Sequence, residues 1–239
     1  MGDTIQSVLV NIALGLVTSL LGGGFVWLGE RAKRARELNR RAEFFGVRPG
    51  ETCLVVLGGK HDAPGSAHYA DVRAVVEFSL LVGELGCEAE LEPGDFRGSN
   101  GDRTEFCVGG PLGSNARTGG HLAAHLPGVT VHPYRAGDPE SVAIEVGGEK
   151  FPYSRRDQEY ALVAKFTPGE SGRPVFLVCG QSATGNLAAV HFLRREFGRV
   201  AGRLPSAGRF CLLIKVSGIG TYGHHRAELE RDVSAAAFG

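Results

Sequence analysis

Residues 174–193 read PVFLVCGQSATGNLAAVHFL: a short apolar run, then a glycine-rich turn, then the start of an apolar helix. An uninterrupted apolar run of this length is typical of a strand that is buried on both faces, as strands of parallel sheets are. The helix is expected from Leu187 to about Val200. This segment therefore predicts a strand, a tight turn and a helix packed on the sheet.

The same succession recurs through the rest of the chain from residue 50. We expect further strands at 52–57, 87–91, 105–108, 129–132, 141–146, 161–166 and 210–216, and helices at 69–85 and from a Ser114-Asn115 cap to about residue 126. Strands alternate with helices, and three of the strands end in glycine-rich loops. The pattern predicts a three-layer, Rossmann-like α/β domain with a mainly parallel sheet over residues 50–239.

A long apolar segment precedes this domain. Residues 7–28, SVLVNIALGLVTSLLGGGFVWL, contain no charge, and a helix needs roughly 20 apolar residues to cross a bilayer. A basic cluster follows, and the positive-inside bias keeps such a flank in the cytoplasm. We expect one transmembrane helix within residues 1–28, a basic juxtamembrane helix or linker at 29–49, and a cytoplasmic domain held at the cell membrane. The two alternatives are a cleaved signal peptide and a buried helix. The first fits poorly because the start is acidic and the apolar run is long, and the second because the run is apolar all round.

Small residues recur every fourth position in this segment, at Asn11, Gly15, Ser19 and Gly23. Such a stripe lets two helix backbones approach closely, and Asn can hydrogen-bond across the contact. We expect a homo-oligomer through this stripe. The alternative is that glycine and serine are simply common in membrane helices.

Composition limits the partners of the distal domain. The chain has 26 basic and 26 acidic residues, and much of the basic excess lies beside the apolar segment. The distal domain is therefore mildly acidic, which argues against a nucleic-acid binder, and the basic run is better suited to membrane lipid headgroups. The five cysteines are far apart, show no metal spacing, and fit free thiols in a reducing cytosol.

Three glycine-rich loops follow expected strands, and ligands of such sheets bind at the carboxyl ends of the strands. Glycines let the backbone approach a ligand, and the starts of helices favour an anion such as phosphate. The loops match neither the P-loop nor the GxGxxG pattern. The alternative is that tight strand-to-helix turns need glycine in any case. The candidate ligand-binding residues are Gly58 and Gly59, then Gly109, Gly110, Ser114 and Asn115, then Gly180, Ser182, Thr184, Gly185 and Asn186.

A second group of candidate site residues lies just before the expected strand at 161–166. Asp157 and Glu159 are weak catalytic candidates, because a carboxylate near a sugar can stabilise an oxocarbenium-like centre, and Tyr160 is a weaker candidate for ribose or base contacts. The alternative is a solvated turn with arginine partners. His121 and His125 share one helix face but lack the glutamate of a zinc-protease motif, and we expect no metal.

The stretches FCVGGPLGSN, DQEYALV and VFLVCGQSATGNLAAVHFL resemble signatures of TIR-like and SLOG-like Rossmannoid domains. The resemblance implies glycine-rich loops that bind or process nucleotides, NAD among them, sometimes beside a membrane helix in bacterial nucleotide signalling and anti-phage defence. A TIR NAD hydrolase places a catalytic glutamate near its third helix, and HLAAHL has none, which puts NAD cleavage in doubt.

Three functions remain open from the sequence. The first is a membrane-anchored, sensor-like domain that binds a nucleotide or an NAD-like ligand. The second is an NAD or nucleoside glycosidase that uses Asp157 or Glu159. The third is a scaffold that contacts only protein partners at the membrane.

Overall fold

The computed structural model describes residues 2–60, 62–63, 65–98, 101–112, 115–169, 172–204, 206 and 208–239, with side chains from residue 23 onward. The chain divides into two compact units, Met1–Arg41 and Ala42–Gly239.

The first unit consists of most of helix α1 (Gly2–Phe45). Of the helices with described side chains, none has a segment long and apolar enough to cross a membrane. Most of the expected membrane span at 7–28 lies outside the residues with described side chains. Three residues of the expected association stripe, Asn11, Gly15 and Ser19, also lie outside them, and the fourth, Gly23, has open space around it.

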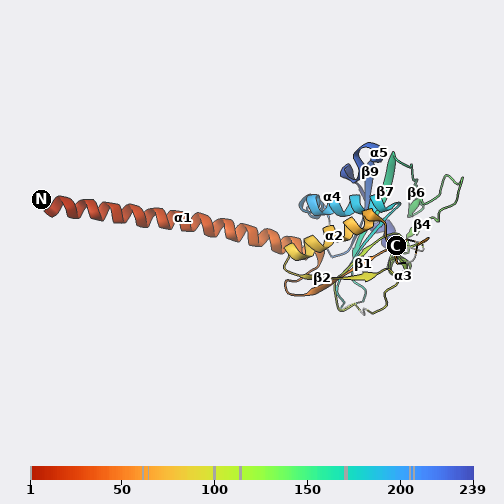
Figure 1. The fold of residues 1–239 in the computed structure, drawn as a ribbon, viewed down its shortest axis with the longest axis horizontal. Coiled ribbons are helices and arrows are strands. Elements are labelled where there is room, and N and C mark those ends of the chain that lie inside the picture. Colours follow the sequence, from red (N-terminus) through yellow and green to blue (C-terminus); the bar gives the residue numbers. More distant parts are fainter. Residues whose placement is uncertain are drawn as a thin grey trace. The chain divides into compact units, whose positions relative to one another are not determined.

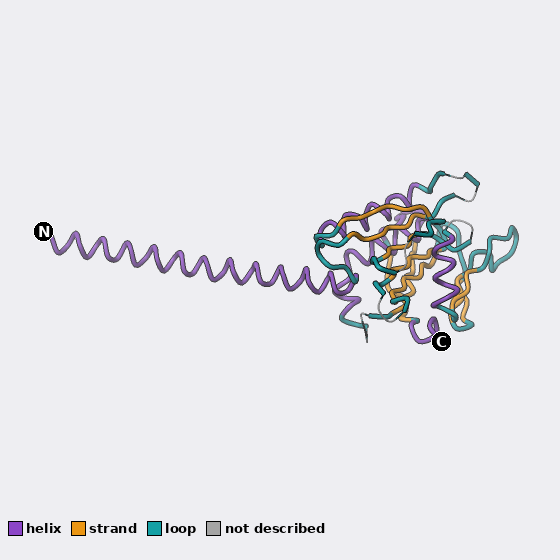
Figure 2. Tube along the Cα trace, turned by 90° about the horizontal axis from the view of Figure 1, so that it is seen from below, coloured by secondary structure: helices purple, strands orange, loops and turns teal. Residues whose placement is uncertain are grey.

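The second unit is a mixed α/β structure built around a large sheet (Figures 1 and 2). Its helices are α2 (Tyr69–Glu84), α3 (Ala116–His125), α4 (Ala183–Ala201), α5 (Ile219–Tyr222), the 3-10 turn η1 (Gly223–His225) and α6 (Ser234–Phe238). Its strands are β1 (Thr52–Leu57), β2 (Glu88–Pro93), β3 (Glu105–Val108), β4 (Val129–Val131), β5 (Ile144–Val146), β6 (Glu149–Phe151), β7 (Gln158–Phe166), β8 (Val175–Gly180), β9 (Phe210–Ser217) and β10 (Ala227–Asp232).

The large sheet has seven strands in the order β10-β9-β7-β8-β3-β1-β2. Strands β2, β1, β3 and β8 pair in parallel, and β9 runs in their direction because it is antiparallel to β7, which is itself antiparallel to β8. The predicted α/β class with a mainly parallel sheet is confirmed. The exceptions are β7 and the edge strand β10.

Two of the expected strands belong elsewhere. The segments at 129–132 and 141–146 contribute β4 and β5, which join β6 in a separate antiparallel sheet of three short strands. Each has only three paired residues, too few to run the depth of the main sheet.

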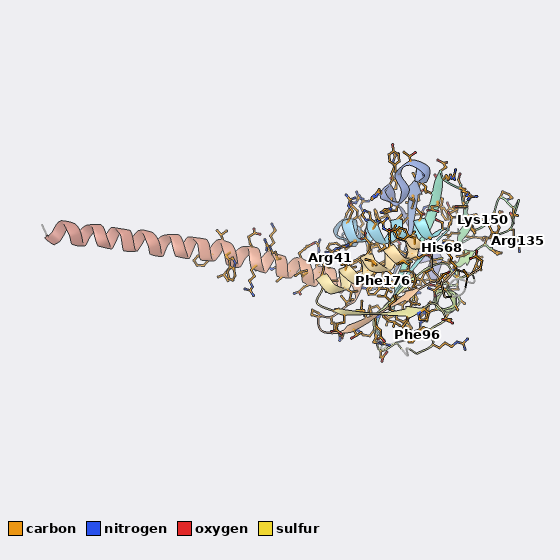
Figure 3. The ribbon with its side chains drawn as sticks, in the orientation of Figure 1. Arg41, His68, Phe96, Arg135, Lys150 and Phe176 are labelled. Atoms are coloured by element: carbon orange, nitrogen blue, oxygen red, sulfur yellow. The ribbon has the colours of Figure 1, made fainter. Side chains whose placement is uncertain are left out.

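Alternate residues of the strands point to the two faces of the sheet, and each face has its own apolar core. In β1, Cys53 and Val55 belong to the core under α2 and α4, whereas Leu54 and Val56 belong to the core beneath α3, α6 and the small sheet. The helices α2 and α4 pack against each other on the first face (Figure 1). Phe176, labelled in Figure 3, lies in the first core.

The last turn of α1 belongs to the second unit and starts it earlier than the predicted residue 50. Phe44 and Phe45 are fully buried in the first core, where their rings meet Phe176. Lys165, on β7, donates hydrogen bonds to the carbonyl oxygens of Glu43 at 3.1 Å and Phe44 at 2.7 Å. A buried cation at a helix C-terminus satisfies carbonyls that have no partner within the helix.

Candidate functional site

The chain order of the strands defines a crevice at the carboxyl ends of the strands. From β1 the chain passes through α2 to β2 on one side of β1. Strand β3 lies on the other side of β1, and the following helix α3 packs on the face of the sheet opposite α2. Helices on opposite faces leave a gap at the carboxyl ends of the strands, where open α/β sheets bind ligands. Here that gap is the space beyond the ends of β1, β2 and β3.

A pocket of about 650 Å³ lies in this crevice. The volume is in the usual range for small-molecule sites. Its walls are the loop after β1, the end of β2 with the following turn, and the start of α3. The lining residues are Leu57, Gly58, Gly59, Lys60, Gly65, Ser66, Ala67, Leu91, Glu92, Pro93, Gly94, Asp95, Pro111 and Ala116.

Gly59 differs from the other candidate glycines. A Cβ built on it meets only the carbonyl oxygen of Ser66, at 3.6 Å, and its φ angle is one that other residues adopt. Neither packing nor backbone geometry therefore requires glycine at this position. A side chain at 59 would instead reduce the free space of the pocket.

Gly109 is glycine for a structural reason. Its φ is +124°, and a Cβ there would lie 3.3 Å from the Cα of Gly58. The loops after β1 and β3 therefore run close together beside the pocket, and the N–H of Gly58 donates a hydrogen bond to the carbonyl of Val108 at 2.9 Å. Gly110 is half-buried in the same loop, and Ser114 lies outside the described residues.

Asn115 is fully buried and caps α3. Its Oδ1 accepts a hydrogen bond from the backbone N–H of Thr118 at 2.9 Å, and its Nδ2 donates to the carbonyl of Val108 at 3.1 Å. The N–H of Arg117 is bonded to the carbonyl of Gly94. These contacts use donors of the first turn of α3 that the expected phosphate cradle would have offered.

The loop after β8 lies at the same carboxyl end of the sheet as the pocket, because β8 is parallel to β3. It does not line the described pocket. A Cβ on Gly180 would lie 2.7 Å from the backbone nitrogen of Asn186, so the turn requires glycine there. Ser182 caps α4 by accepting from the N–H groups of Thr184 and Gly185. Gly180 and Ser182 thus have roles within the turn, and the backbone N–H groups of Thr184 and Gly185 are bonded to Ser182. The assignment of these four residues to a ligand stays a prediction.

Asn186 connects three elements. Its Oδ1 accepts a hydrogen bond from the Gly180 N–H at 2.5 Å, and its Nδ2 donates to Asp71 on α2 at 2.8 Å. Burial raises the pKa of Asp71, and the hydrogen bond from Asn186 opposes that rise. The side chain therefore joins β8, α4 and α2, and its contacts explain why an amide is placed there.

The two carboxylate candidates have different environments. Asp157 is exposed, and its carbonyl accepts from the N–H of Gly218 at 2.6 Å. Glu159 is 1% exposed, and no hydrogen-bond partner of its Oε1 is found among the described residues. Burial raises the pKa of Glu159, against a hydrogen bond with Ser182. It lies beside Gly185 and away from the pocket walls.

Tyr160 is buried against Phe151, and its hydroxyl accepts a hydrogen bond from Gln158 at 2.7 Å. It belongs to the core beneath the small sheet and does not line the described pocket.

An ion-pair cluster holds α3 against the sheet. Glu105, the first residue of β3, accepts hydrogen bonds from Arg117 Nε at 2.9 Å and Nη2 at 2.5 Å, and its Oε2 lies 3.2 Å from His121 Nε2. Burial raises the pKa of Glu105, but these partners outweigh it and hold the pKa at about 2. Arg117 also lies over the ring of Phe96, the residue labelled in Figure 3.

Glu105, Cys107 and His121 also form a group whose ligand atoms come within 4.8 Å of one another. Both carboxylate oxygens of Glu105 are already bonded to Arg117 or His121, and burial raises the pKa of the Cys107 thiol. A metal site needs a thiolate and a carboxylate without a competing cation. The geometry therefore favours an ion pair over a metal site.

Lys60, Glu92 and Asp95 line the pocket, but we did not expect them from the sequence. Each follows or ends a strand that was predicted. The carboxyl ends of parallel strands lie at the same end of the sheet. A position just after a predicted strand was therefore the only signal in the sequence that these residues could meet. Comparison with protein-family models, curated proteins and solved structures gave no significant match. The site is therefore interpreted from its own geometry, and the resemblance to TIR-like and SLOG-like domains stays a prediction.

Proposed function

We propose that the Rossmann-like α/β unit binds a nucleotide or a similar phosphate-bearing ligand in the pocket beyond β1, β2 and β3. The observation that carries the proposal is the position of the 650 Å³ pocket at the point where the chain order reverses, with Gly59 in its wall for no structural reason. Such a pocket is the default binding site of an open α/β sheet.

The charges of the lining support this class of ligand. Lys60 supplies a cation on the β1 side, suited to a phosphate. Glu92 and Asp95 supply carboxylates on the β2 side, and carboxylates there accept hydrogen bonds from ribose hydroxyl groups in dinucleotide-binding folds. A ligand with an anionic group at one end and hydroxyl groups at the other matches this arrangement.

We do not extend the proposal to cleavage of NAD or nucleosides. Glu159, the buried acidic candidate, faces Gly185 and is not part of the pocket lining, and Asp157 is on an exposed turn. The membrane location expected from residues 7–28 remains part of the proposal and is tested separately. Extraction of membranes with alkaline carbonate should leave the chain in the pellet, and recovery in the supernatant would contradict the anchor.

Thermal unfolding of the full-length chain tests the binding proposal. We would measure the melting temperature with ATP, GTP, NAD, cyclic dinucleotides and inorganic phosphate, each over a range of concentrations. A ligand at 100 times its Kd adds about 2.7 kcal/mol to the free energy of unfolding, which is readily measured. Absence of a shift with every probe would favour the protein scaffold instead.

Two glycine variants locate the site. Gly59→Leu fills the pocket without backbone strain, so it should abolish the shift and leave the melting temperature of the free protein unchanged. Gly120→Leu is the matched control, because Gly120 also has open space around it but does not line the pocket; it lines an adjoining hollow that shares Asp95 and Ala116 with the pocket. A shift that survives Gly59→Leu and is lost in Gly120→Leu would place the ligand in that second hollow.

A further inference from the structure

Several backbone donors in the wall of the pocket beyond β1, β2 and β3 are bonded within the protein. The N–H of Gly58 donates to the carbonyl of Val108 at 2.9 Å, and the N–H of Lys60 donates to that of Ser66 at 2.8 Å. The N–H of Ser66 itself donates to the carbonyl of Ala63 at 3.1 Å. Sites for di- and triphosphates use several such N–H groups together, in a glycine-rich loop or at a helix N-terminus. In the loop after β1 these three donors are used by the protein itself.

The first turn of α3 is occupied in the same way. The N–H of Arg117 donates to the carbonyl of Gly94 at 2.9 Å, and the N–H of Thr118 donates to Asn115 Oδ1 at 2.9 Å. The N–H of Gly119 donates to the carbonyl of Asn115 at 3.1 Å. Anions bind at a helix N-terminus through these same donors. Helix α3 therefore does not supply the cradle that a chain of phosphates needs.

The charged side chains of the lining limit the negative charge that a ligand can carry. Lys60 is the cation of the described lining, and Glu92 and Asp95 are its carboxylates. No ion pair of these three side chains is found in the part of the chain that the structure describes. One ammonium group can balance one phosphate group. Each further phosphate brings negative charge into a cavity that already holds two carboxylates, and such like-charge contacts weaken binding.

The arginines of the adjoining hollow do not change this balance. Arg97 and Arg117 line that hollow and are not part of the pocket lining. Arg117 donates to Glu105 through Nε and Nη2, so its charge is matched within the protein. Arg97 is exposed, and water and salt screen its charge. The pocket itself thus offers a ligand the single cation of Lys60.

The rest of the lining suits a nucleoside. Apolar surface accepts the face of a base, and the carboxylates at the end of β2 can accept hydrogen bonds from ribose hydroxyl groups. The apolar lining residues come from both sides of the pocket and are Leu57, Ala67, Leu91, Pro93, Pro111 and Ala116.

We infer that the ligand is a nucleoside with a single phosphate group, such as a nucleoside 5′-monophosphate, and that the pocket disfavours di- and triphosphates by charge. This ligand class rests on the proposed function, because it requires that a nucleotide binds in this pocket. Lys60 then pairs with the phosphate, and Glu92 and Asp95 select against longer phosphate chains.

Thermal shifts of the full-length chain with adenosine, AMP, ADP and ATP test the ligand class. The guanine and uracil series are measured in parallel, because the lining does not specify the base. Without Mg²⁺, AMP should bind about tenfold more tightly than ATP, with ADP between them. Raising NaCl to about 0.5 M should narrow the difference, because salt screens the repulsion. Lys60→Gln should weaken AMP about tenfold and leave adenosine unchanged, because it removes the partner of the phosphate alone.

A double variant, Glu92→Gln with Asp95→Asn, separates charge from size. It keeps the shapes of the two side chains but removes their charge, so ATP should bind about as tightly as AMP. Glu88→Gln is the matched control, because it removes a carboxylate from the same strand four residues, or about 13 Å, before Glu92 and should leave the difference between AMP and ATP intact. The melting temperatures of the free variants show that each is folded.

Four results would overturn the inference and leave the nucleotide site in place. These are ATP binding as tight as that of AMP, AMP binding no tighter than that of adenosine, and a difference between AMP and ATP that survives in the double variant. The fourth is ATP binding that equals that of AMP in Mg²⁺ and is lost in Asp95→Asn, because the carboxylates would then hold a metal ion that carries the phosphates. Absence of a shift with all members of the three series would overturn the proposed function itself, and the inference with it.

Discussion

Replacing Glu105 by glutamine tests the ion-pair cluster that holds α3 against the sheet. The substitution keeps the shape of the side chain but removes the charge that faces Arg117 and His121. The pKa of Glu105 falls from an ordinary 4.5 to about 2 in the folded protein. At about 1.4 kcal/mol per pKa unit this corresponds to about 3 kcal/mol of stability at pH 7. Breaking a buried pair by removing one partner costs a similar amount.

The dependence on pH distinguishes this charge effect from a packing defect. A carboxyl group with a lowered folded pKa stabilises the fold above its unfolded pKa, and this contribution is lost as the pH falls through the folded pKa. The difference between wild type and Glu105→Gln should therefore be about 3 kcal/mol at pH 7 and shrink progressively between pH 4.5 and 2.

The assay is urea unfolding followed by circular dichroism at pH 7 and at pH 2.5. Glu90→Gln is the control, because Glu90 forms an exposed pair with Arg103 and its loss should cost less than 1 kcal/mol. A difference for Glu105→Gln that is equal at the two pH values would refute the electrostatic explanation, and so would a difference at pH 7 no larger than that of the control.

Two further predictions concern the turn after β8 and the histidines of η1. Gly180→Ala should lower the free energy of unfolding by about 1–3 kcal/mol, because the new Cβ would lie 2.7 Å from the backbone nitrogen of Asn186, whereas Gly59→Ala should leave it unchanged in the same urea titration. Burial, together with His225, Arg73 and His191, lowers the pKa of His224 to about 4. Since the unfolded chain takes up this proton first, wild type should lose stability as the pH falls from 6.5 to 4, and His224→Phe should lose less; parallel pH profiles of the two proteins would contradict this origin.

The sequence was informative wherever a strand or helix is defined by its own residues. The strands Thr52–Leu57 and Glu105–Val108 were predicted with their observed bounds, because an apolar run closed by glycine identifies a buried strand. It was not informative about direction. A run buried on both faces has the same pattern whether it is parallel or antiparallel, so β7 gave no sign that it runs against β8. The strand β10 was missed because its sequence, AELERD, is charged and mostly exposed.

The candidate site shows the same limit. Glycine-rich loops at one sheet edge could be expected from the strands, but the reason for each glycine is a contact between distant residues. Gly180 and Asn186 are close in sequence, yet the bond from Asn186 to Asp71 joins helices 115 positions apart. Glu105 gave no signal as a buried acid, because its partners Arg117 and His121 are recognised only once α3 is placed over β3.

The position of β7 between β8 and β9 has a consequence for synthesis. β7 is nine residues long and almost wholly buried, and its partner β9 is translated more than forty residues after β7 ends. Until residues 210–217 leave the ribosome, the nascent chain keeps one apolar strand edge unpaired, and such an edge can pair with another chain. Slow elongation or truncation in this interval should therefore favour aggregation of the nascent polypeptide.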